Sequence, residues 1–146
     1  MIVTGLPLDG WRIMKFVSLI GERDVIEEWL EKRVSIGERK GVRVELEAIL
    51  RNLRFLRAES WSRPQFAWLQ GHNCQGIGEL ITDYRGVPYR PLGCFGPEPD
   101  QFTLLIGARK DRKRKGKVQW DPENAVETAV QRKALLNEQR VSQYVL

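Results

Sequence analysis

Side chains alternate between two faces over residues 11–17, and the segment is rich in bulky residues, a pattern typical of a β-strand. The period then changes. Hydrophobic residues such as Ile26 and Leu30 now stand four positions apart, the spacing that builds one face of an α-helix. The pattern therefore predicts a strand followed by a helix over residues 23–33.

A second helical stripe of leucine and isoleucine covers residues 42–56, with arginine and glutamate at the intervening positions. Gly37 and Gly41 are expected to separate it from the first helix. Three extended segments joined by turns of glycine and proline follow the helices, over residues 77–83, 87–95 and 102–108. These segments predict an antiparallel meander.

Two prolines interrupt the middle extended segment. Pro88 and Pro91 each lack a backbone N–H donor, so we expect that strand to be bent, bulged or partly at an edge. Asp121 and Pro122 are suited to an N-cap and a first helical turn, which predicts a last helix over about 122–140.

The predicted order of elements is therefore β-α-α-β-β-β-α. Strands grouped beside helices indicate an α+β fold, in which a small antiparallel sheet is covered on one face by the helix pair. Residues 57–76 lack a regular pattern and contain Pro64, so we expect loops there. Trp61 and Trp68, within that stretch, are expected to anchor the core rather than to stack on bases.

Length and composition fit one folded domain over residues 1–146. The chain has a mass of 16.9 kDa, with 42% hydrophobic and 29% charged residues, which disfavours disorder. The longest apolar stretch, residues 16–20, is too short for a membrane span or a signal core and predicts a cytoplasmic protein without membrane association. Cys74 and Cys94 are expected to be free thiols, and with one histidine they are too few for a structural zinc site, so no metal or other cofactor is predicted.

Positive charge is concentrated in residues 109–117, which read RKDRKRKGK. This basic loop carries a net charge of +6, whereas the whole chain carries +5, so the rest of the chain has a net charge of −1 and is nearly neutral. Such a cluster favours a local anionic partner, and phosphate is the natural candidate; a solvated loop or a site for a partner's carboxylates is the alternative. No aromatic residue interrupts the run, so it predicts contact with the backbone of RNA rather than with its bases. The expected RNA-binding residues are Arg112, Lys113, Arg114, Lys115 and Lys117.

The second half of the chain resembles a known family through three motifs and a helix. They are Gly-x-x-Glu-Leu at 76–80, Tyr-Arg-Pro-Leu-Gly-x-Phe-Gly-Pro at 89–97, Phe-Thr-Leu-Leu-x-Gly-Ala at 102–108, and the final helix with its Arg-Lys-Ala sequence at 132–134. In this order and spacing they resemble the HigB-like, phage-derived branch of the RelE/ParE toxin superfamily. The resemblance covers roughly residues 11–140.

The resemblance implies a compact RelE-like fold and a toxin of a type II toxin-antitoxin module, inhibited by a helix-turn-helix antitoxin. HigB and RelE members are mRNA interferases, endoribonucleases that cut messenger RNA on translating ribosomes without metal and so inhibit translation. ParE members instead poison DNA gyrase. A ribosome-dependent endoribonuclease is the leading hypothesis; a gyrase-binding toxin, or a phage-derived binding module without catalysis, is the alternative.

RNA cleavage of this kind needs a general base for the ribose 2′-OH, cations that stabilise the phosphorane, and an acid for the leaving oxygen. Arginine suits the second role because its rigid fork stays charged and binds phosphate at two points. Arg90 and Arg109 stand where RelE-type enzymes place functional arginines, and both are expected at one site. The alternative for Arg90 is an ion pair within the sheet, such as one with Glu79.

The acid and the base are less strongly indicated. Lys110, crowded by neighbouring cations, is the candidate base. His72 is a secondary candidate because histidine titrates near neutrality, although it is placed in a loop. Tyr144 is a possible equivalent of a late tyrosine in some relatives. The chain departs from the family at Gly78 and Leu80, where the resembling enzymes carry lysines.

Overall fold

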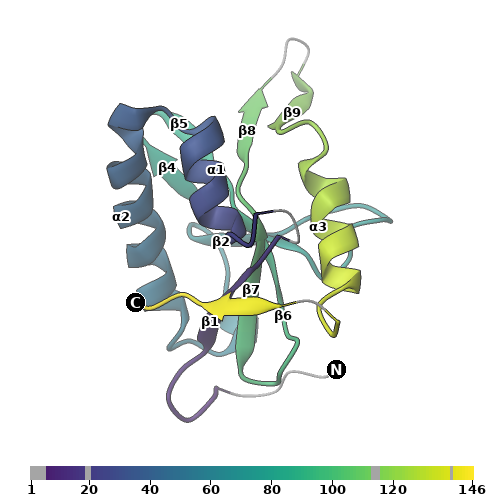
Figure 1. Cartoon of the computed structure of the whole chain (residues 1–146). Coiled ribbons are helices and arrows are strands. Elements are labelled where there is room, and N and C mark those ends of the chain that lie inside the picture. The colour runs from purple at the N-terminus through teal and green to yellow at the C-terminus, as the bar shows by residue number, and fades with distance from the viewer. Residues whose placement is uncertain (1–5, 19–20, 113–115, 139) are drawn as a thin grey trace.

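The computed structural model describes residues 6–18, 21–112, 116–138 and 140–146 (Figure 1). Within them are three α-helices, one short 3-10 helix and ten strands. The helices are α1 (Val25–Arg33), α2 (Ile36–Leu53) and α3 (Ala125–Ala134), and the 3-10 helix is Ala58–Ser60. The strands are β1 (Arg12–Phe16), β2 (Phe66–Trp68), β3 (Gly78–Leu80), β4 (Thr82–Tyr84), β5 (Val87–Tyr89), β6 (Leu92–Phe95), β7 (Gln101–Ile106), β8 (Arg109–Arg112), β9 (Val118–Asp121) and β10 (Val141–Gln143).

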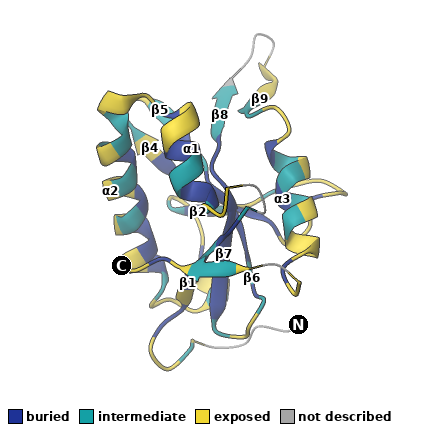
Figure 2. Ribbon diagram, in the orientation of Figure 1, coloured by how far each residue is buried: buried dark blue, intermediate teal, exposed yellow. Residues whose placement is uncertain are grey.

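Six strands form the larger sheet, in the order β10-β1-β7-β6-β3-β2. β1 runs parallel to β7, with Ile13 opposite Phe102, and the other neighbouring pairs are antiparallel. Every residue of β7 is buried, as its dark blue ribbon shows in Figure 2. Because α1 and α3 both pack against β7, this strand is the middle of the core.

The remaining four strands form a second sheet, in the order β4-β5-β8-β9. The chain passes directly between the sheets three times: from β3 to β4 at Ile81, from β5 to β6 through Arg90 and Pro91, and from β7 to β8 through Gly107 and Ala108. A fourth passage, from β9 to β10, runs through α3. The predicted β-α-α-β-β-β-α order, and with it the expected RelE-like fold, is therefore wrong. The fold is richer in strands, and its strands form two sheets.

Proline explains part of this difference. Pro91 has no N–H to donate, so the predicted strand over 87–95 cannot continue through it in one ladder. The backbone instead joins the two sheets at this point: Arg90 N donates to Ala108 O at 2.7 Å, and Leu80 N donates to Pro91 O at 2.9 Å. The three direct crossings of the chain are thus hydrogen-bonded to one another.

The helices differ from the predicted ones mainly at their ends. α1 begins where expected because the Asp24 carboxylate accepts hydrogen bonds from the N–H groups of Ile26 and Glu27. α2 begins six residues before the predicted start, and Gly41 lies inside it. A Cβ at Gly41 would lie 2.0 Å from the ring of Tyr84, so this glycine allows the helix to approach β4 closely.

The last helix is shorter than predicted. Asp121 does not cap it: this residue ends β9 and forms an ion pair with Arg33 at 2.5 Å. α3 begins at Ala125, after Asn124, whose side chain makes no capping hydrogen bond. None of the described helices is long and apolar enough to cross a membrane.

An aromatic cluster fills one end of the core. Trp61 is 3% exposed and its ring packs on Phe66, Phe95 and Phe102 at centroid distances of 4.8–5.4 Å, so its predicted role as a core anchor is confirmed. Trp68 differs, because 43% of this residue is exposed at the end of β2. Its assignment to the core was wrong: β2 is the last strand of the sheet, and its end faces solvent.

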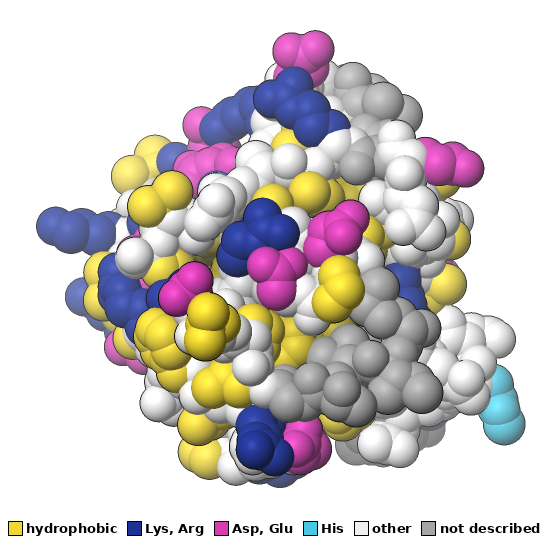
Figure 3. Space-filling view, turned by 90° about the horizontal axis from the view of Figure 1, so that it is seen from below, with side chains coloured by type: hydrophobic (Ala, Val, Ile, Leu, Met, Phe, Trp, Pro, Cys, Tyr) yellow, Lys and Arg dark blue, Asp and Glu magenta, His cyan; other side chains and the backbone are white. Residues whose placement is uncertain are grey.

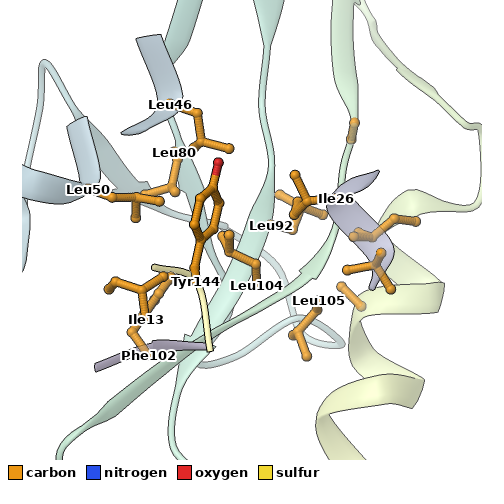
Figure 4. Close-up of a cluster of buried hydrophobic side chains, with 14 of the residues drawn as sticks. Ile13, Ile26, Leu46, Leu50, Leu80, Leu92, Phe102, Leu104, Leu105 and Tyr144 are labelled. Atoms are coloured by element: carbon orange, nitrogen blue, oxygen red, sulfur yellow. The ribbon is translucent and has the colours of Figure 1, made fainter. Parts of the chain in front are cut away.

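Tyr144 lies in the core and not at a surface site. Figure 4 shows its ring among buried leucine and isoleucine side chains, and it is 6% exposed. Its hydroxyl donates to a Glu47 carboxylate oxygen at 3.1 Å, and burial raises the pKa of this phenol. Tyr144 N also donates to Ile13 O of β1 at 2.7 Å, so this residue anchors the end of the chain to both α2 and β1. The possible catalytic role of Tyr144 has no support in this position.

Candidate active site between the two sheets

A hollow of about 360 Å³ lies where the two sheets meet. Glu79 of β3 contributes to its wall from the larger sheet, and Lys110 of β8 from the smaller one. Arg90, in the crossing after β5, and Arg63, in the loop before β2, add two guanidinium groups. Asp111 of β8 also reaches its lining, so the hollow combines two carboxylates with three cationic side chains.

Glu79 is the most buried charged residue of this site, with 3% of its surface exposed. Lys110 Nζ donates to both of its carboxylate oxygens, at 3.3 Å and 3.2 Å. A charge removed from water is costly unless a counter-charge and hydrogen bonds replace the solvent, and Lys110 supplies both. The Lys110 side chain remains 30% exposed, so the ion pair opens toward the hollow.

Arg90 lines the same hollow but does not pair with Glu79. Its Nη1 donates to the Asp83 carboxylate and to the carbonyl oxygen of Tyr89, at 2.8 Å each. The alternative expected for Arg90, an ion pair within the sheet, is therefore present, with Asp83 of β4 as the partner in place of Glu79, which binds Lys110. The Arg90 side chain is 14% exposed and its orientation is set by two acceptors, which leaves other N–H groups for a ligand.

Arg109 lies on the opposite face of the smaller sheet. Consecutive residues of a strand point to opposite faces, and Arg109 is paired with Tyr89 and Asp121, whereas Lys110 is paired with Trp120. The Asp111 carboxylate accepts from Arg109 and raises the pKa of its guanidinium.

The face that carries Arg109 lines a separate hollow of about 640 Å³, together with Arg33 and the Asp121–Asn124 turn. The expectation that Arg90 and Arg109 share one site is therefore wrong. Its physical reason is the alternation of side chains in β8, which brings Lys110, and not Arg109, to the side of Arg90.

His72 lies outside the hollow. It is exposed in the loop between β2 and β3, and the cyan side chain in Figure 3 projects from the surface. It does not line any of the described hollows around Glu79. No contact of the described residues connects His72 with Arg90 or Lys110, so its secondary catalytic assignment has no geometric support.

The basic segment forms the arms of a hairpin and not simply a loop. β8 and β9 pair from Arg109 opposite Asp121 to Arg112 opposite Val118, and Figure 1 shows the hairpin extending beyond the tops of α1 and α3. Lys117 is exposed just before β9. The side chain of Arg112 and residues 113–115, which were predicted to bind RNA, lie outside the described structure.

A second, smaller hollow of about 290 Å³ adjoins the first. The two share Glu79, Lys110, Arg63 and Val118, and the second adds Trp68 and Trp120. The Lys110 ammonium lies 5.4 Å from the centre of the Trp120 ring, a cation–π distance. Cations, two carboxylates and indole rings thus line one continuous depression.

Both cysteines are free, as predicted, and both are buried. Burial raises the pKa of the Cys94 thiol to about 12. Among the described residues, no three or more histidine, cysteine, aspartate or glutamate side chains are grouped to hold a metal ion.

Glu79, Arg63 and Trp120 were not identified as functional candidates from the sequence. A signal for Glu79 was present: in the segment 77–83 it alternates onto the same side as Ile77 and Ile81, and a carboxylate on an apolar strand face needs a special partner. Arg63 and Trp120 carry no comparable local signal, because their proximity depends on the crossing of the two sheets.

Comparison of the chain with protein-family models, with curated proteins and with solved structures finds no match. Functional assignment therefore starts from the side chains of the hollow.

Proposed function

We propose that the chain is an endoribonuclease that cleaves RNA in the hollow around Glu79 and Lys110. The observation that carries this proposal is the buried Glu79 carboxylate, held by Lys110 Nζ at 3.2 Å in a depression that Arg90 and Arg63 also line. Cleavage of RNA requires a base that accepts the proton of a ribose 2′-OH, and a carboxylate in a fixed position can serve as that base. It also requires cations beside the phosphate, because the phosphate gains negative charge in the transition state.

In the proposed reaction Glu79 accepts the proton of the 2′-OH. The 2′-oxygen attacks phosphorus as the bond to the 5′-oxygen breaks, and the Lys110 ammonium donates a proton to that leaving oxygen. The products are a 2′,3′-cyclic phosphate and a 5′-hydroxyl. The proton on Glu79 then passes to Lys110 across their 3.2 Å contact, which restores both groups.

The guanidinium groups have a separate role. Arg90 is oriented by Asp83 and the Tyr89 carbonyl, so it can bind the equatorial phosphate oxygens with little loss of side-chain entropy. Lys110 takes the part of acid and phosphate ligand in this scheme, and not the part of base expected from the sequence. Its Nζ already donates to both Glu79 oxygens, which places Lys110 as a proton donor and Glu79 as the acceptor.

The resemblance of the three strand motifs supports a biological setting for this activity. In that setting the chain is a toxin that inhibits translation by cutting messenger RNA on ribosomes, and a helix-turn-helix antitoxin neutralises it. Coverage of a cationic depression by acidic or amphipathic antitoxin segments is consistent with general interface physics. No geometric feature of the described residues specifically favours gyrase as the target.

The test compares wild-type protein with Glu79→Gln on 5′-labelled messenger RNA, with and without translating ribosomes. We expect the variant to lose about 10²- to 10⁴-fold in cleavage rate, the usual contribution of general acid–base catalysis. Glu27→Gln is the matched control, because Glu27 also pairs with a cation, Arg43, but lies on α1. Uncut RNA with wild-type protein and ribosomes would reject the proposal, and inhibition of supercoiling instead would support the gyrase alternative.

A further inference from the structure

The second hollow, which shares the Glu79–Lys110 pair with the first, adds apolar and aromatic side chains that the proposed cleavage does not use. Its volume of about 290 Å³ is near the lower end of the range for small-ligand sites. Leu69, Val118 and Val126 line it together with the two indoles. Gln70 is the neutral polar side chain at its wall. This lining suits a flat, aromatic group with polar edges.

Trp120 connects this apolar lining to the charged site. It stands opposite Lys110 in the β8–β9 ladder, so both side chains point to the same face of the smaller sheet. Trp120 is only partly buried, and its ring lies beside the Lys110 ammonium at 5.4 Å. A group stacked on this ring would therefore lie next to the phosphate-binding cations.

Trp68 forms another part of the wall, from the edge strand of the larger sheet. Phe66 and Phe95 contact its ring, at centroid distances of 5.0 Å and 6.0 Å, and restrict its orientation. Even so, 43% of the residue is exposed. A large indole that is held by neighbours and still open to solvent is a stacking surface available at little entropic cost.

We propose that this second hollow binds one unpaired nucleobase, stacked on Trp120 and flanked by Trp68, while Arg63 and Lys110 hold the adjoining phosphate. The inference rests on the proposed cleavage of RNA and specifies its substrate as single-stranded. A base inside a duplex is covered on both faces by its neighbours, so it enters such a site only after unpairing. The shared lining of the two hollows places the base directly beside the phosphate that reacts.

The test is a binding titration of the Glu79→Gln protein, in which cleavage does not interfere, with a short fluorescein-labelled oligouridylate followed by anisotropy. We expect Trp120→Leu to weaken binding by about 5- to 150-fold, the range that loss of one base–aromatic stack produces. Trp120→Phe keeps a ring and is expected to retain most of the affinity. A duplex of the same length is expected to bind more weakly and to be insensitive to Trp120→Leu.

Matched variants keep the result interpretable. Trp68→Leu removes an exposed ring of the same hollow and is expected to weaken binding of the oligouridylate, whereas Phe55→Leu removes an exposed ring elsewhere and is expected to leave it unchanged. Thermal unfolding of each variant shows that the protein folds; if Trp120→Leu does not, Trp68→Leu supplies the decisive measurement.

Each outcome separates this inference from the proposed reaction. Folded tryptophan variants that bind the oligouridylate as tightly as their parent would overturn the base site, even where wild-type protein cleaves RNA. Equal loss of duplex and single-stranded affinity would overturn it as well. If wild-type protein does not cleave RNA but binding of the oligouridylate depends on Trp120, the base site stands and the endonuclease proposal fails. A deoxyribose oligonucleotide is expected to bind through the same stack and to remain uncut, because it lacks the 2′-OH.

Discussion

Replacing Lys110 by methionine is expected to destabilise the whole protein, because it leaves the Glu79 carboxylate buried without its cation. Glu79 is 3% exposed, and Lys110 Nζ donates to both of its oxygens. Of the residues that the structure describes, no other gives this carboxylate a side-chain hydrogen bond. Methionine matches the length of the lysine stem but donates nothing, so the substitution removes the charge and the donor while it keeps the packing.

The magnitude follows from the burial of the two partners. Removing one member of a buried ion pair costs about 3–5 kcal/mol, because the remaining charge is unpaired. We expect about 3 kcal/mol, the lower end, since Lys110 is 30% exposed and water can reach the carboxylate through the hollow. In a domain of this size that corresponds to a fall in the melting temperature of about 10 °C.

The assay is urea denaturation followed by tryptophan fluorescence, completed as a double-mutant cycle with Glu79→Gln. The double variant has no buried charge, so we expect it to be more stable than Lys110→Met alone by about 1–2 kcal/mol. A free energy of unfolding within about 0.5 kcal/mol of wild type for Lys110→Met, or additive effects in the cycle, would refute the assignment of a buried, coupled ion pair. The proposed acid–base pair would then lose its structural basis as well.

Three further predictions concern other sites. The Arg43 guanidinium donates hydrogen bonds to the Glu27 carboxylate and lowers the pKa of Glu27 below its ordinary 4.5. The stability that this pair contributes is therefore present above pH 4.5 and is lost as the pH falls through the lowered pKa. In acid denaturation between pH 6 and 3, the free energy of unfolding should decline less steeply for Glu27→Gln than for wild type. Cys94, whose thiol has a pKa of about 12, should react with thiol reagents at pH 8 only after the protein unfolds. The reaction is measured by absorbance in a Cys74→Ser background, and rapid labelling of the folded protein would contradict the burial of Cys94. Arg109→Gln should leave the rate of RNA cleavage within about twofold of wild type, because Arg109 lies on the face of the smaller sheet opposite Lys110. Its ion pair with Asp111 is partly exposed, so the substitution should lower the free energy of unfolding by less than ~1 kcal/mol. A large loss of cleavage would show that the face of Arg109 takes part in the reaction.

Much of the secondary structure was predictable from local periodicity. The strand over 11–17 and the helix over 23–33 are confirmed as β1 and α1 with small changes at their ends. Both have a strong repeat, and a capping aspartate marks the start of α1. β2, β8, β9 and β10 were missed, because strands of three or four residues are too short to establish a period.

The candidate site was predicted in part. Arg90 and Lys110 do line one hollow, but Arg109 lies on the other face and His72 lies in an exposed loop. The sequence motifs indicated that Arg90 and Arg109 lie near other cations, but they did not predict which face of the sheet each side chain would occupy. In β8 a single position decides this, because neighbouring residues point in opposite directions.

The sequence by itself determined the properties that depend on near neighbours: the helical stripes, the first strand, the cationic run at 109–117 and the carboxylate on the apolar side of 77–83. Only the tertiary structure decided that β5, β8 and the crossing at Arg90 lie together, and that Glu79 meets Lys110 from 31 positions away. The physical reason is that pairing between strands depends on which backbone donors remain available after each proline and turn. That competition is resolved over the whole chain, and it brings together two carboxylates, three cations and two indoles that no local pattern connects.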